Sequence, residues 1–171
     1  MKIKYVAVIL LVISISCSRG QGKAVRQPVP GKSEMADLNR YFVRKDRERI
    51  ANYIDRKNLK MTESSSGLWY MIKTEGSGSY LTDRDKITME YECSLLDGTI
   101  CYSSIDLGPK EIIIGKTTME SGLNQGLRML KPGGEAVFIL PPFLAYGITG
   151  DGGKIPPRAV IIYHIKISGN P

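Results

Sequence analysis

The side chains that most enzymes use for covalent or metal-assisted catalysis are scarce in this chain. Its single histidine, His164, alternates away from its apolar neighbours in a strand-like segment, which predicts a surface or helix-facing residue. A metal site needs a cluster of ligands, and the sequence shows none. Ser103 and Ser104 have no base nearby in sequence, and no glycine-rich phosphate loop with a following lysine is present. Any activity should therefore need no nucleophile, metal or organic cofactor.

Rotation about the peptide bond before proline is a reaction that fits this inventory. Its barrier of about 18–20 kcal/mol comes from amide resonance, and no covalent bond is made or broken. A site must only bind the twisted amide better than the planar forms. An apolar cup for the proline ring removes water from the carbonyl and weakens the charge-separated resonance form. Aliphatic and aromatic walls with tyrosine hydroxyls are the ingredients to look for.

Period-two alternation predicts a mostly antiparallel sheet that would position such residues. Every second residue between Lys86 and Cys93 is apolar, and Asp97-Gly98 is a strong hairpin signal. Leucines spaced by four and three predict one short amphipathic helix over 121–130. The remaining strand-like runs lie at residues 67–73, 99–103, 111–114, 135–140 and 159–167. Several antiparallel strands with one short helix make the fold class α+β.

Residues 1–16 have the organisation of a secretory leader. A basic start is followed by an apolar run that is shorter than the roughly 20 residues that a membrane-spanning helix needs. Ser16 places a small residue before Cys17, which resembles the lipobox of bacterial lipoproteins. We expect a lipoprotein signal peptide and lipidation of Cys17, with ordinary secretion and cleavage nearby as the alternative.

Two segments separate Cys17 from the strands. Residues 17–32 are polar and contain several glycines and prolines, so they are expected to form a flexible tether. Residues 33–60 are expected to form a basic amphipathic helix, since apolar side chains recur near a spacing of 3.6 beside a dense charged face. Such an apolar stripe packs either on the protein's own body, which we take as the default, or on a partner chain.

The basic charge of the protein belongs to this arm. Residues 18–60 hold 12 Lys and Arg against 5 Asp and Glu, whereas residues 61–171 hold 10 against 12. A basic segment beside a lipid anchor fits adhesion to anionic headgroups, and a solvated linker and helix is the alternative. The aromatic interleaving typical of nucleic-acid surfaces is missing, so we expect no nucleic-acid partner.

A series of short motifs runs from Gly67 to Ser168. In order they are Tyr91 in its strand, Leu96-Asp97-Gly98, Ser103-Ser104, Ile114-Gly115-Lys116, Ser121 to Leu127, Met129 to Gly134, Leu144-Ala145-Tyr146-Gly147 and Ile155-Pro156-Pro157-Arg158-Ala159. The last two bound a loop that we call the flap (residues 144–159). Together these motifs resemble the FKBP family of peptidyl-prolyl isomerases, which assigns residues 61–171 to one domain. The resemblance implies an antiparallel sheet wrapped on one short helix, preceded by the arm helix, and proline-containing polypeptides as substrates.

The resemblance also implies the residues of a site. Tyr91 matches the family's pocket tyrosine, and Tyr146 matches the flap tyrosine whose hydroxyl binds a substrate carbonyl, so both are expected to act in catalysis. The residues expected to bind substrate are Cys101, Tyr102, Met119, Glu120 through its backbone N–H, Leu123, Ile155 and Tyr163. Packing of the sheet core is the alternative role for Tyr91 and Tyr163.

Three positions depart from the family pattern. Leu123 stands in place of the usual floor tryptophan, Cys101 in place of an aromatic residue, and Tyr102 in place of the aspartate thought to polarise the substrate carbonyl. These changes predict weaker activity. They also keep open a second function, a non-catalytic peptide-binding or scaffold module on the same fold.

Cys93 and Cys101 are symmetrically placed about the Asp97 turn. In a simple hairpin they would lie directly across from each other, where a disulfide could form in an oxidising compartment. Two small buried thiols are the alternative.

The layout of anchor, tether, arm helix and domain resembles the gliding motility-associated isomerase lipoproteins of gliding bacteria. This resemblance implies a lipid-anchored protein of the bacterial cell envelope that faces the periplasm. It also implies partners in motility or secretion machinery, and a role in folding exported proteins.

Overall fold

The computed structural model describes residues 31–168. The predicted leader at 1–16, the lipidation residue Cys17 and all but the end of the 17–32 tether lie outside the described residues. The chain divides into two units, Met1–Met35 and Ala36–Pro171. The sheet and both cavities discussed below belong to the second unit.

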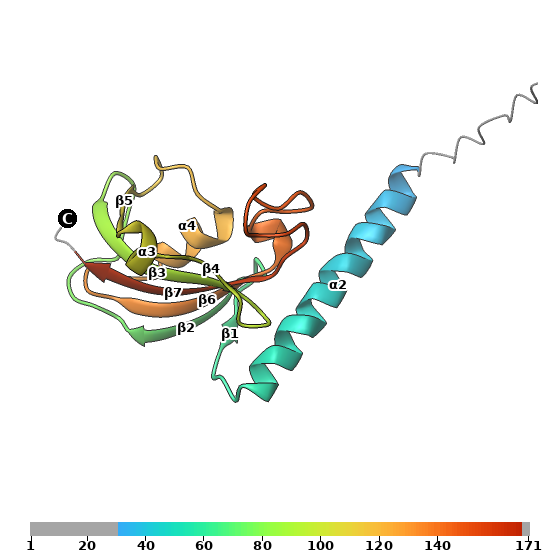
Figure 1. The fold of residues 1–171 in the computed structure, drawn as a ribbon, viewed down its shortest axis with the longest axis horizontal. Coiled ribbons are helices and arrows are strands. Elements are labelled where there is room, and N and C mark those ends of the chain that lie inside the picture. The colour runs from blue at the N-terminus through green and yellow to red at the C-terminus, as the bar shows by residue number, and fades with distance from the viewer. Residues whose placement is uncertain (1–30, 169–171) are drawn as a thin grey trace, which may run out of the picture. The chain divides into compact units, whose positions relative to one another are not determined.

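Among the described residues, seven antiparallel strands form one sheet in the order β1-β2-β6-β7-β3-β4, and β5 pairs with β3 (Figure 1). The strands are β1 (Thr62–Glu63), β2 (Trp69–Thr74), β3 (Lys86–Leu95), β4 (Ile100–Ser103), β5 (Lys110–Ile113), β6 (Glu135–Leu140) and β7 (Ile161–Ser168). The helices are α2 (Lys32–Arg56), α3 (Ser104–Leu107), α4 (Ser121–Leu127) and the 3-10 helix η1 (Pro142–Leu144). The expected α+β class is confirmed.

The central strand β6 is covered on both faces. Phe138 and Leu140 point into the main core on the α4 side, whereas Val137 and Ile139 point to the opposite side, where α2 packs. Because neither face meets water, β6 reads as a nearly continuous apolar run instead of an alternating one.

The neighbouring strand β7 shows where the cover of α2 ends. Ile162 packs with the α2 side of the sheet, but His164 and Lys166, further along the same face, are exposed. The expected surface position of His164 is therefore confirmed.

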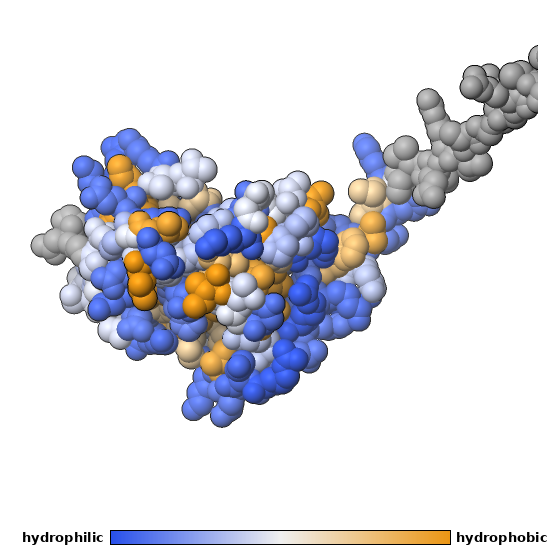
Figure 2. Space-filling model, in the orientation of Figure 1, coloured by the Kyte–Doolittle hydropathy of each residue, from blue (hydrophilic) through white to orange (hydrophobic). Residues whose placement is uncertain are grey.

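The arm helix α2 packs on the protein's own sheet through its last turns, as expected by default. Ile50 and Ile54 are buried against Val137, Ile139 and Ile162. The C-terminal end of α2 and its surroundings are predominantly hydrophilic on the surface (Figure 2).

The helix ends at Arg56, four residues before the predicted limit of residue 60. Asn58 adopts a positive φ of 51°, and the N–H groups of Asn58 and Leu59 donate to Asp55 O and Ile54 O at 3.1 and 3.0 Å. This pair of bonds is the Schellman pattern that closes a helix. The predicted range was too long because this local cap ends the helix, and Leu59 then packs on the sheet outside it.

The short helix α4 lies unusually close to β6. A Cβ atom added at Gly126 would come within 2.8 Å of the Phe138 ring, and one added at Gly122 within 2.8 Å of Leu140. These glycines therefore allow the close approach that places Leu123 in the core.

A partly buried ion pair joins α2 to the end of the flap. Asp46 is 4% exposed, and its Oδ2 accepts a hydrogen bond from Arg158 Nη2 at 2.9 Å. The Arg158 guanidinium also lies over the Phe42 ring, 3.8 Å from its centroid.

No helix in the described part of the chain is long and apolar enough to span a membrane.

Candidate active site

An open cavity of about 420 Å³ lies between β3, β5 and the segment that leads into α4. Its lining consists of Met89, Lys110, Glu111, Ile112, Thr117, Thr118, Met119, Glu120, Leu123 and Tyr146. Met119, Glu120, Leu123 and Tyr146 were all expected to contact substrate. Cavities of 300–1,000 Å³ are typical of small-ligand sites, so this one is large enough for a proline side chain and its neighbouring peptide groups.

Two buried tyrosines form a second layer behind this lining. The ring centroids of Tyr91 and Tyr163 are 6.4 Å apart. The Tyr163 hydroxyl donates a hydrogen bond to Glu120 Oε1 at 2.8 Å. The Tyr91 hydroxyl is also buried, but it has no partner among the described residues. An unpaired buried hydroxyl costs about 1–3 kcal/mol, so Tyr91 holds an unused donor beside the cavity.

Tyr146 is positioned by the tight turn that follows η1. The N–H groups of Ala145 and Gly147 both donate to Pro142 O, at 3.0 and 2.8 Å. Burial and the neighbouring Glu120 carboxylate raise the pKa of the Tyr146 hydroxyl well above its usual value. The hydroxyl is therefore protonated at neutral pH and can donate a hydrogen bond.

Glu120 is the residue before the first turn of α4, in an extended conformation (φ −60°, ψ 139°). None of the described residues accepts a hydrogen bond from its backbone N–H. Leu123 lies one turn later and is 3% exposed, so it forms an apolar floor where a larger aromatic residue was expected from the family pattern. The start of α4 thus supplies a free amide donor and an apolar surface to the same cavity.

Tyr102 and Ile155 do not line this cavity, but they are joined through the flap residue Asp151. The Tyr102 hydroxyl donates to Asp151 Oδ2 at 2.6 Å, and the N–H groups of Gly153 and Ile155 donate to Asp151 Oδ1 at 2.8 and 2.9 Å. The bond from Tyr102 lowers the pKa of the Asp151 carboxyl. Position 102 therefore offers a hydroxyl that holds the flap in one conformation, in place of a carboxylate facing substrate.

Cys101 is buried in the core next to the flap, where its Sγ lies 3.6 Å from Lys154 O. Cys93 and Cys101 are free thiols. The expected pairing of β3 with β4, in which Cys93 lies directly across from Cys101, is wrong. Cys93 pairs with Tyr102, and Ser94 with Ile100, because an irregularity after Cys93 places one extra residue in β4. The two cysteines are therefore not directly across from each other, and burial raises the pKa of the Cys93 thiol to about 12.

Two residues at the site were not foreseen from the sequence. Lys110 lines the cavity and places its Nζ 4.7 Å from the centroid of the Tyr91 ring. It was missed because the predicted strand began one residue later. Asp151 was missed because its two glycine neighbours indicate a turn, whereas its partner Tyr102 is 49 residues away. The sequence around position 102 carries no signal for this partner.

The arrangement can bind a small apolar ring and donate hydrogen bonds to adjacent carbonyl groups. Met119 and Leu123 provide apolar contact, while the Tyr146 hydroxyl and the Glu120 N–H provide the donors. Within residues 31–168, no group of three or more His, Cys, Asp or Glu side chains could hold a metal ion.

Comparison with known proteins agrees with this geometry. Residues 78–168 match the family described as FKBP-type peptidyl-prolyl cis-trans isomerase. A probable FKBP-type isomerase, FkpA of Neisseria meningitidis, is 39% identical over 105 residues, which are 61% of this chain and 38% of that protein. FkpA of Buchnera aphidicola (strain Bp) is 36% identical over 118 residues, 69% of this chain and 45% of that protein. The chain thus spans less than half the length of these curated relatives.

Solved structures show the same fold. The crystal structure of AtFKBP13 aligns with a TM-score of 0.60 and 30% identity, and covers 66% of this chain and 99% of that chain. FkpA from Escherichia coli aligns with a TM-score of 0.61 over 97% of this chain and 80% of that chain, but at 21% identity it supports the fold alone. From its sequence match and its architecture, this chain belongs to the FKBP-type peptidyl-prolyl cis-trans isomerase family.

Proposed function

We propose that this chain is a peptidyl-prolyl cis-trans isomerase that assists the folding of exported polypeptides. The observation that carries the proposal is the cavity at Leu123 and Met119, which combines apolar walls with a protonated Tyr146 hydroxyl and a free Glu120 N–H. The family membership of the chain supports the same activity.

The proposed mechanism is preferential binding of the twisted amide. The proline ring enters the apolar cavity over Leu123, which removes water from the amide and disfavours its charge-separated planar form. The Tyr146 hydroxyl and the Glu120 N–H bind carbonyl oxygens on either side of the rotating bond. Because these donors are fixed before substrate arrives, they stabilise the twisted state without reorganising.

An isomerisation assay on a proline-containing peptide tests this function. Tyr146→Phe removes one hydrogen bond to the reacting peptide, worth about 1.4 kcal/mol, so kcat/KM should fall by about tenfold. Tyr80→Phe is the matched control, since Tyr80 is a half-exposed tyrosine whose hydroxyl bonds Glu75 outside the cavity. A native chain that does not accelerate isomerisation, or equal losses in both variants, would count against the proposal.

A non-catalytic peptide-binding module is the second candidate, and the state of Tyr102 favours it. The family's carboxylate is absent there, and the hydroxyl in its place is committed to Asp151. This candidate predicts that a proline peptide binds in the cavity of the native chain without accelerated isomerisation. The Leu123→Arg variant should no longer bind the peptide.

We also propose that the protein is held at the bacterial cell envelope by a lipid on Cys17 and faces the periplasm. The basic start, apolar run and Ser16-Cys17 pair support this location. Metabolic labelling with palmitate should mark the native protein and leave Cys17→Ala unlabelled. Unlabelled native protein, or Cys17→Ala protein that stays in the membrane fraction, would contradict the anchor.

A role in gliding motility or secretion is the most specific part of the proposal. It is supported by the order of leader, tether, arm helix and isomerase-family domain along the chain. A strain that lacks this protein should glide or secrete poorly and should recover with the native gene. Normal gliding and secretion in the deletion strain would refute this role and leave the isomerase activity untouched.

A further inference from the structure

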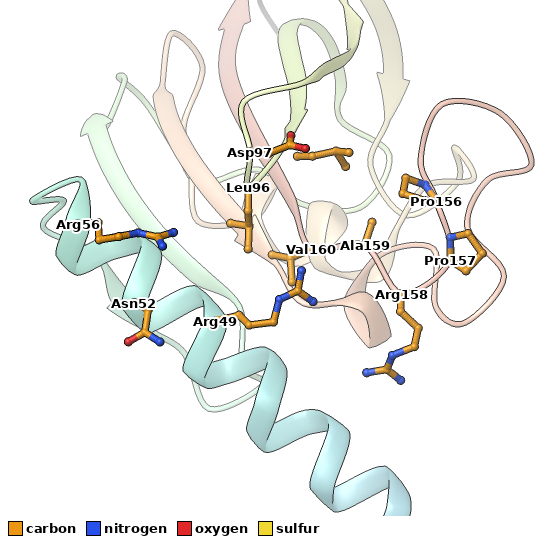
Figure 3. Close-up of a pocket in the computed structure, with 11 residues that line it drawn as sticks. Arg49, Asn52, Arg56, Leu96, Asp97, Pro156, Pro157, Arg158, Ala159 and Val160 are labelled. Atoms are coloured by element: carbon orange, nitrogen blue, oxygen red, sulfur yellow. The ribbon is translucent and has the colours of Figure 1, made fainter.

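A second cavity, of about 670 Å³, lies away from the proposed isomerase site, where α2 faces the β3–β4 hairpin and the end of the flap. The last turns of α2 contribute Arg49, Asn52 and Arg56 (Figure 3). Leu95 to Asp97 form the hairpin side, and Pro156 to Val160 form the flap side. Helix α2 precedes the residues that match the family, so this cavity depends on a part of the chain outside that match.

The charges around the cavity are mainly positive. Three arginines and one aspartate line it. Arg158 is paired with Asp46 at 2.9 Å, and Arg49 lies 3.5 Å from the same carboxylate. Arg56 has no acidic side chain within ion-pair distance among the described residues. Figure 3 shows Arg49 and Arg56 extending from α2 toward the strand and hairpin residues.

The lining between these charges is apolar. Leu95, Leu96, Pro156, Pro157 and Val160 contribute hydrophobic surface. Asn52 also lines the cavity, but its amide is directed away from the hairpin and the flap (Figure 3). A recessed apolar surface edged by guanidinium groups matches a polypeptide segment with acidic side chains, because guanidinium groups bind carboxylates through two parallel hydrogen bonds.

We propose that this cavity binds an acidic, extended segment of a client polypeptide. Glutamate or aspartate side chains pair with Arg49 and Arg56, and intervening apolar side chains contact the leucine and proline surface. A membrane fits these observations less well, since a bilayer surface is broad and cannot enter a recess bounded by a helix and a hairpin.

The cavity adjoins the flap, so a client bound there would lie near the proposed isomerase site. Pro156 lines it, and the preceding Ile155 is held by Asp151 within the flap that carries Tyr146. A client bound at the second cavity would therefore keep its remaining chain near the proposed isomerase site, which raises the effective concentration of its prolines there. The binding itself does not depend on isomerase activity.

Fluorescence anisotropy with the purified chain and a short, labelled, proline-free peptide of glutamate, leucine and glycine tests the proposal. The double variant Arg49→Gln/Arg56→Gln should bind this peptide about tenfold more weakly, since two partly exposed charge pairs are lost. Binding by the native chain should weaken as salt is added. A peptide with glutamine in place of glutamate should bind as weakly as the double variant does.

The matched control is Lys57→Gln/Lys60→Gln, which removes the same charge from exposed positions outside the cavity. Equal loss in this control would refute the cavity as the site. If Arg49→Gln/Arg56→Gln loses binding to phosphatidylglycerol vesicles while its peptide binding is unchanged, the ligand of these arginines is a membrane surface and the proposal is refuted.

A second measurement covers a failure of the double variant to fold. In the native chain, the side-chain Nε–Hε NMR signals of Arg49 and Arg56 should shift when the acidic peptide is added. Unshifted signals would overturn the proposal. Because the peptide contains no proline, its binding can fail while isomerisation succeeds, and the reverse, so the two proposals are tested separately.

Discussion

Replacing Tyr91 by phenylalanine should stabilise the protein and weaken its activity. The Tyr91 side chain is 4% exposed, and its hydroxyl has no partner in the described structure. Removing the unpaired hydroxyl removes a cost of about 1–3 kcal/mol, but it leaves a void of one atom, which offsets part of this gain. We therefore expect a net increase of about 1 kcal/mol in the free energy of unfolding. For a chain of this size, that gain corresponds to a rise of about 3 °C in Tm.

The comparison variant for this prediction is Tyr163→Phe. The Tyr163 hydroxyl donates to Glu120 Oε1 at 2.8 Å, so its removal should lower the free energy of unfolding by about 1 kcal/mol. Urea denaturation of both variants gives the two values, and they should have opposite signs. A destabilised Tyr91→Phe would show that its hydroxyl is hydrogen-bonded in solution, and the argument from an unused donor would fail.

The same Tyr91→Phe protein tests whether its hydroxyl serves the substrate. We expect kcat/KM for a proline peptide to fall severalfold, although the protein is more stable. Lys110 lies over the Tyr91 ring with an exposed side chain, so it can move aside when a peptide enters. Unchanged kcat/KM would leave Tyr91 with a packing role only.

Three other predictions concern the flap and the core. Arg158→Met should lower the free energy of unfolding by about 2 kcal/mol in urea denaturation, because it leaves the buried Asp46 carboxylate with only the longer contact to Arg49 Nη1 at 3.5 Å, and adding Asp46→Asn should restore part of the loss. Asp151→Ala should speed proteolysis of the flap, since it removes the acceptor of three hydrogen bonds. Tyr102→Phe removes one of these three and the 3.3 Å bond from Lys154 N–H to the Tyr102 hydroxyl, so it should have a smaller effect. The Cys93 pKa is raised from 9.0 to about 12 in the folded state, so between pH 9 and 12 the unfolded chain loses this proton first and stability falls as pH rises. At pH 10 the Cys93 contribution should be about 1.4 kcal/mol lower than at pH 8, and Cys93→Ala should show a correspondingly smaller decrease.

Each of these three predictions has an outcome that would contradict it. No rescue by Asp46→Asn would mean that Arg158 stabilises the protein through its stacking on Phe42 alone. Equal proteolysis rates for native protein and Asp151→Ala would show that the flap does not depend on this carboxylate. Identical pH dependence in native protein and Cys93→Ala would place the alkaline loss of stability on other groups.

Local sequence patterns were sufficient to predict most strands and the position of the short helix. The alternation of Ile87, Met89, Tyr91 and Cys93 corresponds to the buried face of β3. Side-chain period follows directly from backbone geometry, so a run of residues reports its own conformation. The ends of the two helices were predicted less accurately, because caps depend on single residues and not on a period. Helix α4 ends at Leu127 and not at residue 130, and α2 ends at Arg56 and not at residue 60.

The candidate site was predictable only in part. The family motifs located Met119, Glu120, Leu123 and Tyr146, which the fold brings to one cavity. They did not reveal that Lys110 borders the same cavity. Its side chain faces the site because β5 pairs with β3 and brings Lys110 opposite Met89, and such pairing between distant segments leaves no local signal.

What the sequence by itself determined is the conformation of most strands and of the two predicted helices, the α+β class and the family motifs of the flap and α4, since these depend on periodicity and on short patterns of residue types. Only the tertiary structure decided the register that separates Cys93 from Cys101, the bond between Tyr102 and Asp151, and the cavity between α2 and the flap. The physical reason is that each of these depends on contacts between residues far apart in the chain, whose geometry is set by how the whole core packs.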